Sequence, residues 1–308
     1  MLPPDDVIRR LREDGSLWDV APGVSGLRGP VVSVLREIES TLADLARAET
    51  ANEWIAPAGV SFETLERAKY FLSFPQWLTA ASHLSGEDAA LAQIAASASP
   101  GASARSSLAP ADVALPPAIC YNTYAAHADS VIASPVVMTA QGTCWRHEGG
   151  RLGALERGWA FTMREIVCIG TEDDVKEFLD RSVERVSELE RALGLDCELA
   201  PASDPFFAPT ARGRAALQRI KGLKHELLFR TPGEQPLAIA SFNDHELFFG
   251  EAFGISLADG TPAWSGCVAF GLERWLLAIL VTYGVDPSSW PPIRSARRKL
   301  VHAGGVHT

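Results

Sequence analysis

The sequence predicts an α+β fold in which an antiparallel sheet is flanked by helices, and three observations support this class. Residues 138–170 contain two strand-like runs joined by a Gly-rich loop, which is the pattern of a hairpin. Residues 171–195 carry apolar side chains at helical spacing behind an acidic first turn. The strand-like runs that follow lack the regular intervening helices of a parallel sheet.

The first 114 residues are expected to be largely helical. Residues 3–14 begin with Pro3 and Pro4 and are predicted to form a short helix. Residues 30–49 predict an amphipathic helix, because apolar residues recur every three or four positions. Residues 62–70 predict a third helix, with Ser61 as its N-cap.

Residues 71–112 show weaker patterns. The apolar segment 71–78, FLSFPQWL, is expected to be extended and to lie at a sheet edge or boundary, because Pro75 has no N–H to donate. Residues 91–98 are expected to be helical. Pro, Gly and Ser dominate residues 99–112 and predict a loop.

Strands are expected to dominate from residue 115. Residues 116–130 predict a short strand and a turn. Further strands are expected within 197–207, at 223–229 and within 236–255, and residues 265–284 predict a strand that leads directly into a helix. We expect the 308 residues to form a single catalytic domain, with an N-terminal helical part at 1–114 and a sheet core at 115–308.

Composition excludes several classes of protein. The chain is 47% hydrophobic and 21% charged, which is ordinary for a globular protein with a core. Its net charge of −10 argues against a protein whose main task is to bind nucleic acid. We expect a cytoplasmic protein without a membrane partner, because there is no apolar run of ~20 residues and no signal-peptide pattern. Five widely spaced cysteines predict metal ligands or core residues rather than a disulfide framework.

The hairpin at 138–170 carries charged side chains that a plain hairpin does not need. Arg146 and Glu148 are two residues apart and share a strand face, as do Phe161 and Glu165 on the returning strand. The loop between them contains four glycines, Arg151 and Arg157. An arginine, an aromatic ring and carboxylates on one face are suited to a nucleoside triphosphate. By itself an Arg-x-Glu pair is also the pattern of a cross-strand ion pair on the surface.

These residues resemble the conserved motifs of class II aminoacyl-tRNA synthetases. Arg146-His147-Glu148, the variable loop, Phe161 and Glu165 resemble motif 2, and residues 270–275, FGLERW, resemble motif 3. Residues 71–78 are a weaker match to motif 1, the dimer-forming helix and strand. The resemblance covers roughly residues 60–290. It is greatest to the atypical zinc-dependent seryl-tRNA synthetases and to their small homologues, the amino acid:[carrier protein] ligases.

The resemblance implies a zinc site formed by Cys120, Glu165 and Cys267. Two thiolates and a carboxylate leave one coordination position open, which can accept water or the amino group of an amino acid. The residues alone leave an alternative open, in which both cysteines are apolar core residues and Glu165 is a paired carboxylate. Cys144 is the rival ligand, because strand parity directs it to the face of Arg146.

The resemblance also implies an ATP site that contains magnesium. Arg146 is expected to contact the α-phosphate and Phe161 to stack on adenine, and Arg274 at the start of the motif 3 helix is expected to contact adenine or the γ-phosphate. Arg146 and Arg274 are the expected catalytic residues. The full expected ATP set is Arg146, Glu148, Arg157, Gly158, Phe161, Ser241, Phe242, Asn243 and Arg274. Asp244 and Glu246 are looser candidates for magnesium ligands, with an ordinary Asx turn as the alternative for Asp244.

The implied function is ATP-dependent activation of a small amino acid, followed by transfer to the phosphopantetheine thiol of a carrier protein. Asp204 and Phe206 resemble the substrate-pocket segment, and glycine is the expected amino acid, with alanine second. The alternatives are a seryl-type tRNA synthetase and a non-catalytic binding protein, but the acidic net charge and the lack of a basic arm argue against a tRNA partner. The resemblance to class II synthetases also implies a homodimer. Basic residues at 210–224 or 294–299 could bind the carrier protein, although either could be a solvated helix face.

Overall fold

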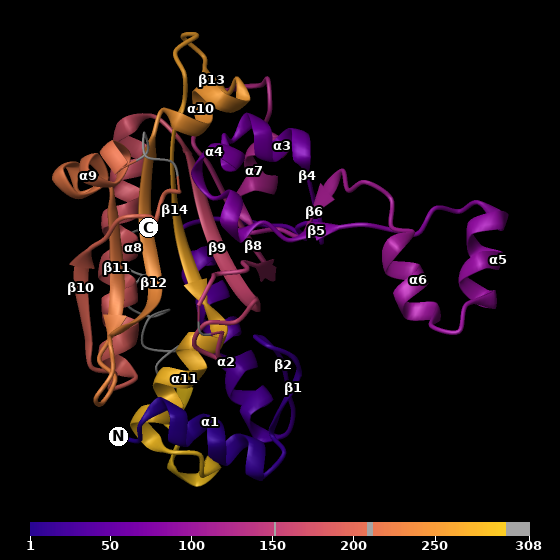
Figure 1. The fold of residues 1–308 in the computed structure, drawn as a ribbon. Coiled ribbons are helices and arrows are strands. Elements are labelled where there is room, and N and C mark those ends of the chain that lie inside the picture. The colour runs from indigo at the N-terminus through magenta and orange to yellow at the C-terminus, as the bar shows by residue number, and fades with distance from the viewer. Residues whose placement is uncertain (151, 208–211, 294–308) are drawn as a thin grey trace.

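A computed structural model describes residues 1–150, 152–207 and 212–293 of the chain. Its centre is a seven-stranded sheet (Figure 1). In spatial order the strands are β10 (Cys197–Pro201), β11 (Lys224–Phe229), β12 (Leu237–Glu246), β14 (Trp264–Gly271), β9 (Ala160–Gly170), β8 (Val136–Trp145) and β3 (Asn52–Glu53). Neighbouring strands are antiparallel except for β3 and β8 at one edge, which are parallel. The predicted α+β class with an antiparallel sheet is confirmed.

The predicted hairpin forms β8 and β9. Cys144 pairs with Phe161 and Ala140 pairs with Glu165, so residues that alternate along the two strands lie on common faces. Ile166 and Cys168 of β9 point into one core, whereas Val167 and Ile169 point into another. The sheet is therefore covered on both faces, and this alternation decides which β9 side chains can line a site.

Long helices cover one face of the sheet. They are α2 (Pro30–Ala48), α8 (Glu172–Ala192) and α11 (Leu272–Tyr283), with α1 (Pro4–Glu13) packed against α11. Helix α8 begins at a capping box, in which Thr171 accepts from the Asp174 N–H and Asp174 accepts from the Thr171 N–H. Its end is followed by Gly194 in the left-handed region. The predicted helices at 3–14, 30–49 and 171–195 are confirmed.

Short elements cover the other face and the ends of the sheet. They are α3 (Phe62–Arg67), α4 (Tyr70–Ser73), a 3-10 helix (Pro75–Trp77), α7 (Cys120–Ala126), α9 (Arg212–Lys221), α10 (Phe248–Phe253) and a 3-10 helix (Pro287–Ser289), with hairpin β1 (Leu17–Ala21) and β2 (Val24–Leu27) and the parallel pair β7 (Val131–Ile132) and β13 (Ser256–Leu257). The Ser61 cap of α3 is confirmed, because its hydroxyl accepts from the Thr64 N–H.

Three predictions of local structure are wrong. Residues 71–78 are not extended: they continue α4 and form the 3-10 helix at Pro75–Trp77, in which Phe74 stacks on Trp77. The motif 1 assignment at 71–78 therefore fails, and a helix followed by a strand occurs instead at α2 and β3. Residues 116–130 contain the helix α7 rather than a strand. Tyr121 and Tyr124 of this helix are both buried in the core.

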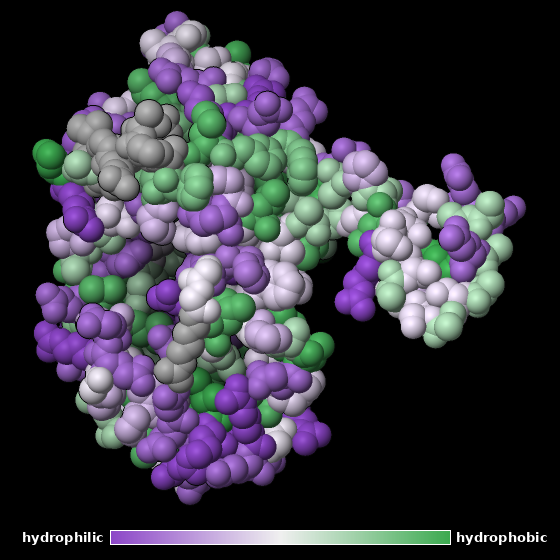
Figure 2. Space-filling model, viewed as in Figure 1, coloured by the Kyte–Doolittle hydropathy of each residue, from purple (hydrophilic) through white to green (hydrophobic). Residues whose placement is uncertain are grey.

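The third error concerns residues 99–112, where the structure has a helix, α6 (Pro100–Ser106). With α5 (Asp88–Ala96), α6 forms an arm that stands away from the body on a stalk of β4 (Val60–Ser61), β5 (Ala80–Ala81) and β6 (Val113–Ala114) (Figures 1 and 2). No residue of either helix is buried. Among the described residues, no helix has the length and apolar character needed to cross a membrane.

Candidate functional site

A pocket of about 460 Å³ lies on the side of the sheet opposite α2, α8 and α11. Strands β9, β12 and β14 provide its floor, and α4, α7 and the loop after β8 provide its walls. Most of the site residues expected from the sequence line this single pocket. It therefore gives a direct check on which of them lie together.

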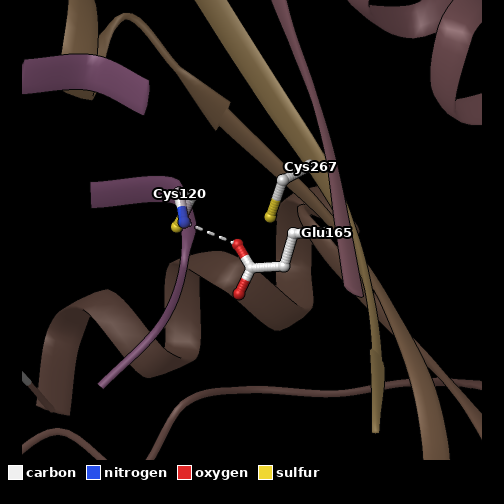
Figure 3. Close-up of side chains that lie close together, drawn as sticks. All are labelled: Cys120, Glu165 and Cys267. Carbon is white, nitrogen blue, oxygen red and sulfur yellow. Dashed lines mark hydrogen bonds between the residues drawn. The ribbon is translucent and has the colours of Figure 1, made fainter. Parts of the chain in front are cut away.

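Cys120, Glu165 and Cys267 meet at the floor of the pocket. Cys120 begins α7, while Glu165 and Cys267 come from the neighbouring strands β9 and β14. Their ligand atoms all lie within 4.8 Å of one another, and all three residues are buried. Figure 3 shows the Glu165 carboxylate between the two cysteines, joined to the Cys120 backbone by a hydrogen bond. The three positions expected from the family resemblance are thus brought together.

The Glu165 carboxylate is positioned by the start of α7. The backbone N–H groups of Ile119 and Cys120 donate to its two oxygens at 3.1 and 2.8 Å. Burial, followed by the negative charge of Cys267, raises the pKa of Glu165 to about 7. The backbone donors act in the opposite direction and hold the carboxylate in one orientation.

The two thiols also influence each other. Their sulfurs lie within 4.8 Å, and this proximity raises the pKa of Cys120 and lowers the pKa of Cys267. Three acids at this separation repel one another when all are ionised, and a bound cation removes that repulsion. Two sulfurs and one carboxylate oxygen form a donor set that suits zinc. Among the described residues, this is the one close group of His, Cys, Asp or Glu ligand atoms.

Cys144 does not join this group. It lies on β8 opposite Phe161, is fully buried, and contacts the small core cluster that contains Ala140 and Met163. Burial raises the pKa of the Cys144 thiol, as expected for an apolar core residue. Cys168 belongs to the main core and Cys197 packs against it.

Asn243, His245 and Tyr124 surround Cys267. The Asn243 side-chain amide donates to the Cys267 sulfur at 3.5 Å, and Nε2 of His245 lies 3.9 Å from the same sulfur. The other ring nitrogen of His245 is 3.0 Å from the Tyr124 hydroxyl. The sequence predicted a role for Asn243 but none for His245 or Tyr124.

Arg146 lies just beyond the end of β8. Its Nε donates to the Pro117 carbonyl at 2.7 Å, and its guanidinium lies 5.5 Å from the ring centres of both Trp77 and Phe161. Burial alone would lower the pKa of Arg146, but the acidic groups of Cys144, Glu148 and Glu165 raise it. The pocket thus contains a fixed cation about which an anionic substrate can be oriented.

Phe161, Glu148 and Arg157 line the same end of the pocket. Phe161 and Glu165 share one face of β9, as strand parity predicted. Arg157 is half-exposed and lies 3.8 Å from Glu148. Gly158 is required by close backbone contact, because a Cβ there would approach the Ala160 carbonyl oxygen to 2.5 Å. Arg151 lies outside the described residues.

Arg274, in the first turn of α11, closes this end of the pocket. Its Nε donates to the Glu156 carbonyl and its Nη1 to the Ala238 carbonyl. Burial lowers the pKa of Arg274. The neighbouring Glu273 accepts from the Thr162 N–H, which ties α11 to β9. These bonds hold Arg274 in the same pocket as Arg146.

The segment Ser241-Phe242-Asn243 divides between two faces of β12. Ser241 and Asn243 line the pocket, but Phe242 is buried in the main core. The expectation that Phe242 contacts ATP is therefore wrong, because successive strand residues point to opposite faces. Asp244 and Glu246 also line the pocket, and Asp244 accepts from the Glu246 N–H, as in an Asx turn.

Asp204 and Phe206 also line the pocket. Phe206 stacks on Phe74 with ring centres 5.1 Å apart. Asp204 accepts from the Lys224 ammonium at 2.5 Å and from the Gln218 amide at 2.9 Å. Burial opposes ionisation of Asp204, but Lys224 outweighs it and lowers the pKa.

The basic segment 210–224 is only partly available as a docking surface. Lys224 is bound to Asp204 inside the pocket wall, and Lys221 of α9 pairs with Glu246. Arg219 is exposed on α9. The side chains of Arg212 and Arg214 and all of residues 294–299 lie outside the described part of the chain.

Tyr70, Trp77 and His245 line the pocket but had no role in the sequence-based prediction, and Lys224 was considered only as part of a basic surface. Trp77 belongs to the segment 71–78, which was predicted to be extended, and Tyr70 ends the predicted helix at 62–70. His245 lies at a bulge in β12, where the regular alternation of a strand no longer applies. Lys224 was noted only for its charge, and its buried partner Asp204 is 20 residues away in sequence.

Comparisons with known proteins identify close relatives. The chain is 39% identical over 238 residues to "Amino acid--[acyl-carrier-protein] ligase 1" of Bradyrhizobium diazoefficiens, which covers 76% of this chain and 72% of that protein. It is 34% identical over 292 residues to "Amino acid--[acyl-carrier-protein] ligase 2" of the same organism, and this match covers 94% of this chain and 86% of that protein. A "Type-2 serine--tRNA ligase" of Methanocaldococcus jannaschii is 30% identical over 162 residues, covering 49% of this chain and 30% of that protein. No protein-family model matches the chain.

Solved structures share the fold at low identity. The seryl-tRNA synthetase of M. kandleri, solved with tRNASec of A. aeolicus, superposes with a TM-score of 0.82 at 20% identity, over 97% of this chain and 61% of that one. The seryl-tRNA synthetase of Pyrococcus horikoshii complexed with ATP gives a TM-score of 0.67 at 12% identity, over 97% and 63%. The chain thus spans under two thirds of these synthetases.

Proposed function

The chain belongs to the family of amino acid--[acyl-carrier-protein] ligases and has the fold of a class II aminoacyl-tRNA synthetase core, and on this premise we propose its substrates and the residues that act on them. It is an ATP-dependent ligase that activates an amino acid and transfers it to a carrier protein. We propose that the amino acid is small, glycine or alanine, and that the acceptor is the thiol of a phosphopantetheine arm.

The observation that carries this proposal is the position of Cys120, Glu165 and Cys267 in the same pocket as Arg146 and Phe161. We propose that these three residues hold zinc, which would supply an open coordination position for the amino group of the substrate. Their shared pocket with Arg146 would direct the substrate carboxylate toward the phosphate-binding end.

In the first step a carboxylate oxygen of the amino acid attacks the α-phosphorus of ATP, and the bond from this phosphorus to pyrophosphate breaks. Arg146 would stabilise the negative charge that develops on the α-phosphate, because its guanidinium is already fixed by Pro117 and two aromatic rings. Phe161 would support adenine, and Arg274, with magnesium, would contact the outer part of the nucleotide.

In the second step the thiol sulfur of the carrier protein attacks the acyl carbon, the bond to AMP breaks, and the thiol proton is released. The preference for a small amino acid is supported by the aromatic side chains around Cys120. Tyr121 follows it directly on α7, and Tyr121 and Phe249 both line the pocket with ring centres 6.1 Å apart. These rings leave little room for a large side chain beside the amino-group site.

Amino-acid-dependent exchange of pyrophosphate into ATP tests the first step. Exchange with glycine or alanine, and none with larger amino acids, is expected. Arg146→Ala should reduce the exchange rate at least a hundredfold, because a fixed donor to transition-state charge is lost. Arg9→Ala on the exposed face of α1 is the matched control and should leave the rate unchanged. An absence of exchange with every amino acid would contradict the proposal.

Loading of a carrier protein tests the second step. Labelled amino acid should appear on the phosphopantetheinylated carrier protein and not on its apo form. Serine tRNA offered in place of the carrier should remain uncharged. Exchange without loading of any phosphopantetheinylated carrier would remove the proposed acceptor while leaving the activation step intact.

We further propose that the enzyme is a homodimer. Strand β3 forms one of the two edges of the sheet, and the nearby Ile55 is 94% exposed. Light scattering should give twice the mass of one chain, and Ile55→Glu should shift this mass toward the monomer. A monomeric wild type would contradict this proposal.

A further inference from the structure

We propose that Tyr124 and His245 form a relay that orients the Cys267 thiolate for metal binding, so that His245 is a positioning residue of the zinc site. This inference rests on the proposed function, since it concerns the metal that the site would hold. Three observations carry it: a bulge in β12, a chain of polar contacts, and the packing of the aromatic rings around it.

The bulge lies at the end of β12. Asn243 pairs with Cys267 and Asp244 pairs with Gly266, but Glu246 pairs with the next residue, Ser265. His245 is therefore the extra residue without a partner across the strand pair. Glu246 has a φ of 50°, a left-handed conformation that is unfavourable for a residue other than glycine. Bulges of this kind redirect one side chain and are frequent beside functional sites.

The bulge directs the His245 ring toward the metal-site cysteine. Nε2 of His245 lies 3.9 Å from the Cys267 sulfur, and Nδ1 lies 3.0 Å from the Tyr124 hydroxyl. A tyrosine hydroxyl that donates to Nδ1 leaves the ring proton on Nε2, which then points at the sulfur. Asn243, which pairs with Cys267 across β12 and β14, donates to the same sulfur.

The relay is held rigidly. Tyr124 is fully buried, and its ring stacks on Phe249, whose ring meets the His245 ring edge-on at 4.8 Å. Tyr124 lies on α7, the helix that also begins with Cys120. One helix therefore supplies a metal-site thiol and, one turn later, the hydroxyl that orients the donor to the second thiol.

Such outer contacts typically change metal affinity by about tenfold to a hundredfold. We expect His245→Leu to weaken zinc binding by that amount, measured by competition with a chromophoric chelator. His245→Asn keeps an N–H donor and should retain more of the affinity. His127→Leu is the matched control, since His127 lies just after α7 and its Nδ1 contacts the Thr123 carbonyl outside the pocket. It should leave zinc affinity unchanged.

The relay also predicts coupling between its two members. Tyr124→Phe should weaken zinc binding in the wild-type background and have no further effect in the His245→Leu background. Additive losses, or unchanged affinity in His245→Leu, would overturn the proposal. A wild type that binds no zinc would overturn it as well.

Cobalt substitution separates an orienting role from direct ligation. The ligand-field bands of the cobalt protein should keep their positions and intensities in His245→Leu, because the ligand set is unchanged. A changed pattern would make His245 a ligand and overturn the relay. Zinc affinity is measured without turnover, so a failure of the relay is distinct from a failure of the proposed activity, which would appear as absent pyrophosphate exchange in the wild type.

Discussion

Cys120 and Cys144 are both buried cysteines near Glu165, and the structure gives them different roles. Cys120 meets Glu165 and Cys267, whereas Cys144 packs among apolar residues of the adjoining strand. We expect Cys120→Ser to lose most of its bound zinc, because a hydroxyl is a poor replacement for a thiolate ligand. Cys144→Ser is the matched control and should retain about one zinc per chain.

Metal content of the purified variants, measured by inductively coupled plasma mass spectrometry, checks this prediction. The opposite pattern, with zinc retained in Cys120→Ser and lost in Cys144→Ser, would transfer the ligand role to Cys144. Circular dichroism of each variant shows whether metal loss reflects the site or a failure to fold.

The Asp204–Lys224 pair is the second residue-scale case. The pKa of Asp204 is lowered, so its contribution to stability is present above its unfolded pKa of about 3.9 and is lost as pH falls through the folded value. The pKa of Lys224 is raised despite burial, owing to Asp204 and Glu226, so its contribution is lost only as pH rises through a value above about 10.4. Between those limits the pair stabilises the pocket wall.

We expect Asp204→Asn to lower the free energy of unfolding by about 2 kcal/mol, because it leaves the buried Lys224 with Glu226 alone. This loss of unfolding free energy is smaller than that expected for a fully buried ion pair, because the Asp204 side chain is 27% exposed. Urea unfolding between pH 5 and 9 should give a constant difference from wild type that shrinks below about pH 4. Equal stabilities at pH 7 would show that the pair contributes nothing.

Strand parity explains which site residues could be found from sequence. Phe161 and Glu165 are four residues apart on a regular strand, so their common face was predictable. The same rule excludes Phe242, which lies between Ser241 and Asn243 and points into the core. His245 was missed because its direction depends on the bulge at the end of β12, which no local pattern indicates.

At the scale of elements, the errors fall where tertiary packing decides the conformation. The segment 71–78 is apolar enough for a strand, but Phe74 packs between Trp77 and Phe206, and the chain turns to form the pocket wall. In 116–130 the tyrosines of α7 are buried against α10 and β9. The long helices, by contrast, were predictable from their apolar periodicity and from the Thr171 cap.

The arm of α5 and α6 is the element least attached to the rest of the molecule. Its two short helices bury no residue, and backbone contacts between Ser85 and Ser107 close its base. In Figure 2 much of its surface has pale colours of intermediate hydropathy, in keeping with its Ala and Ser content. Its helices therefore add little to the core that supports the pocket.

We expect replacement of residues 86–106 by a short Gly-Ser linker to leave the melting temperature within about 2 °C of wild type. Pyrophosphate exchange should also be unchanged, because no residue between 86 and 106 lines the pocket. Differential scanning calorimetry and the exchange assay check the two statements. A large loss of exchange would show that the arm supports the active site.

At the scale of the whole molecule, the chain and its carrier-protein partner carry net charge of the same sign. The chain carries a net charge of −10, and carrier proteins are usually acidic, so an encounter between them requires a local basic surface. Within the described residues of 210–224, Lys221 and Lys224 are already paired with acidic side chains, whereas Arg219 is exposed on α9. Lys224 in particular belongs to the pocket wall and not to a docking face.

We therefore expect Arg219→Glu to raise the KM for the carrier protein by a factor on the order of three to ten, while leaving amino-acid-dependent pyrophosphate exchange unchanged. The variant removes a positive charge from the face of α9, which adjoins the pocket through the Lys221–Glu246 pair. Arg9→Glu makes the same change in net charge on α1, at the opposite end of the molecule (Figure 1), and should leave the KM unchanged. The transfer rate of the wild type should fall as salt rises from 0.05 to about 0.5 M, and that of Arg219→Glu should fall less, because salt screens the attraction that the variant lacks. Equal KM values for the two variants would show that the response follows net charge rather than position, and would remove α9 as the docking element.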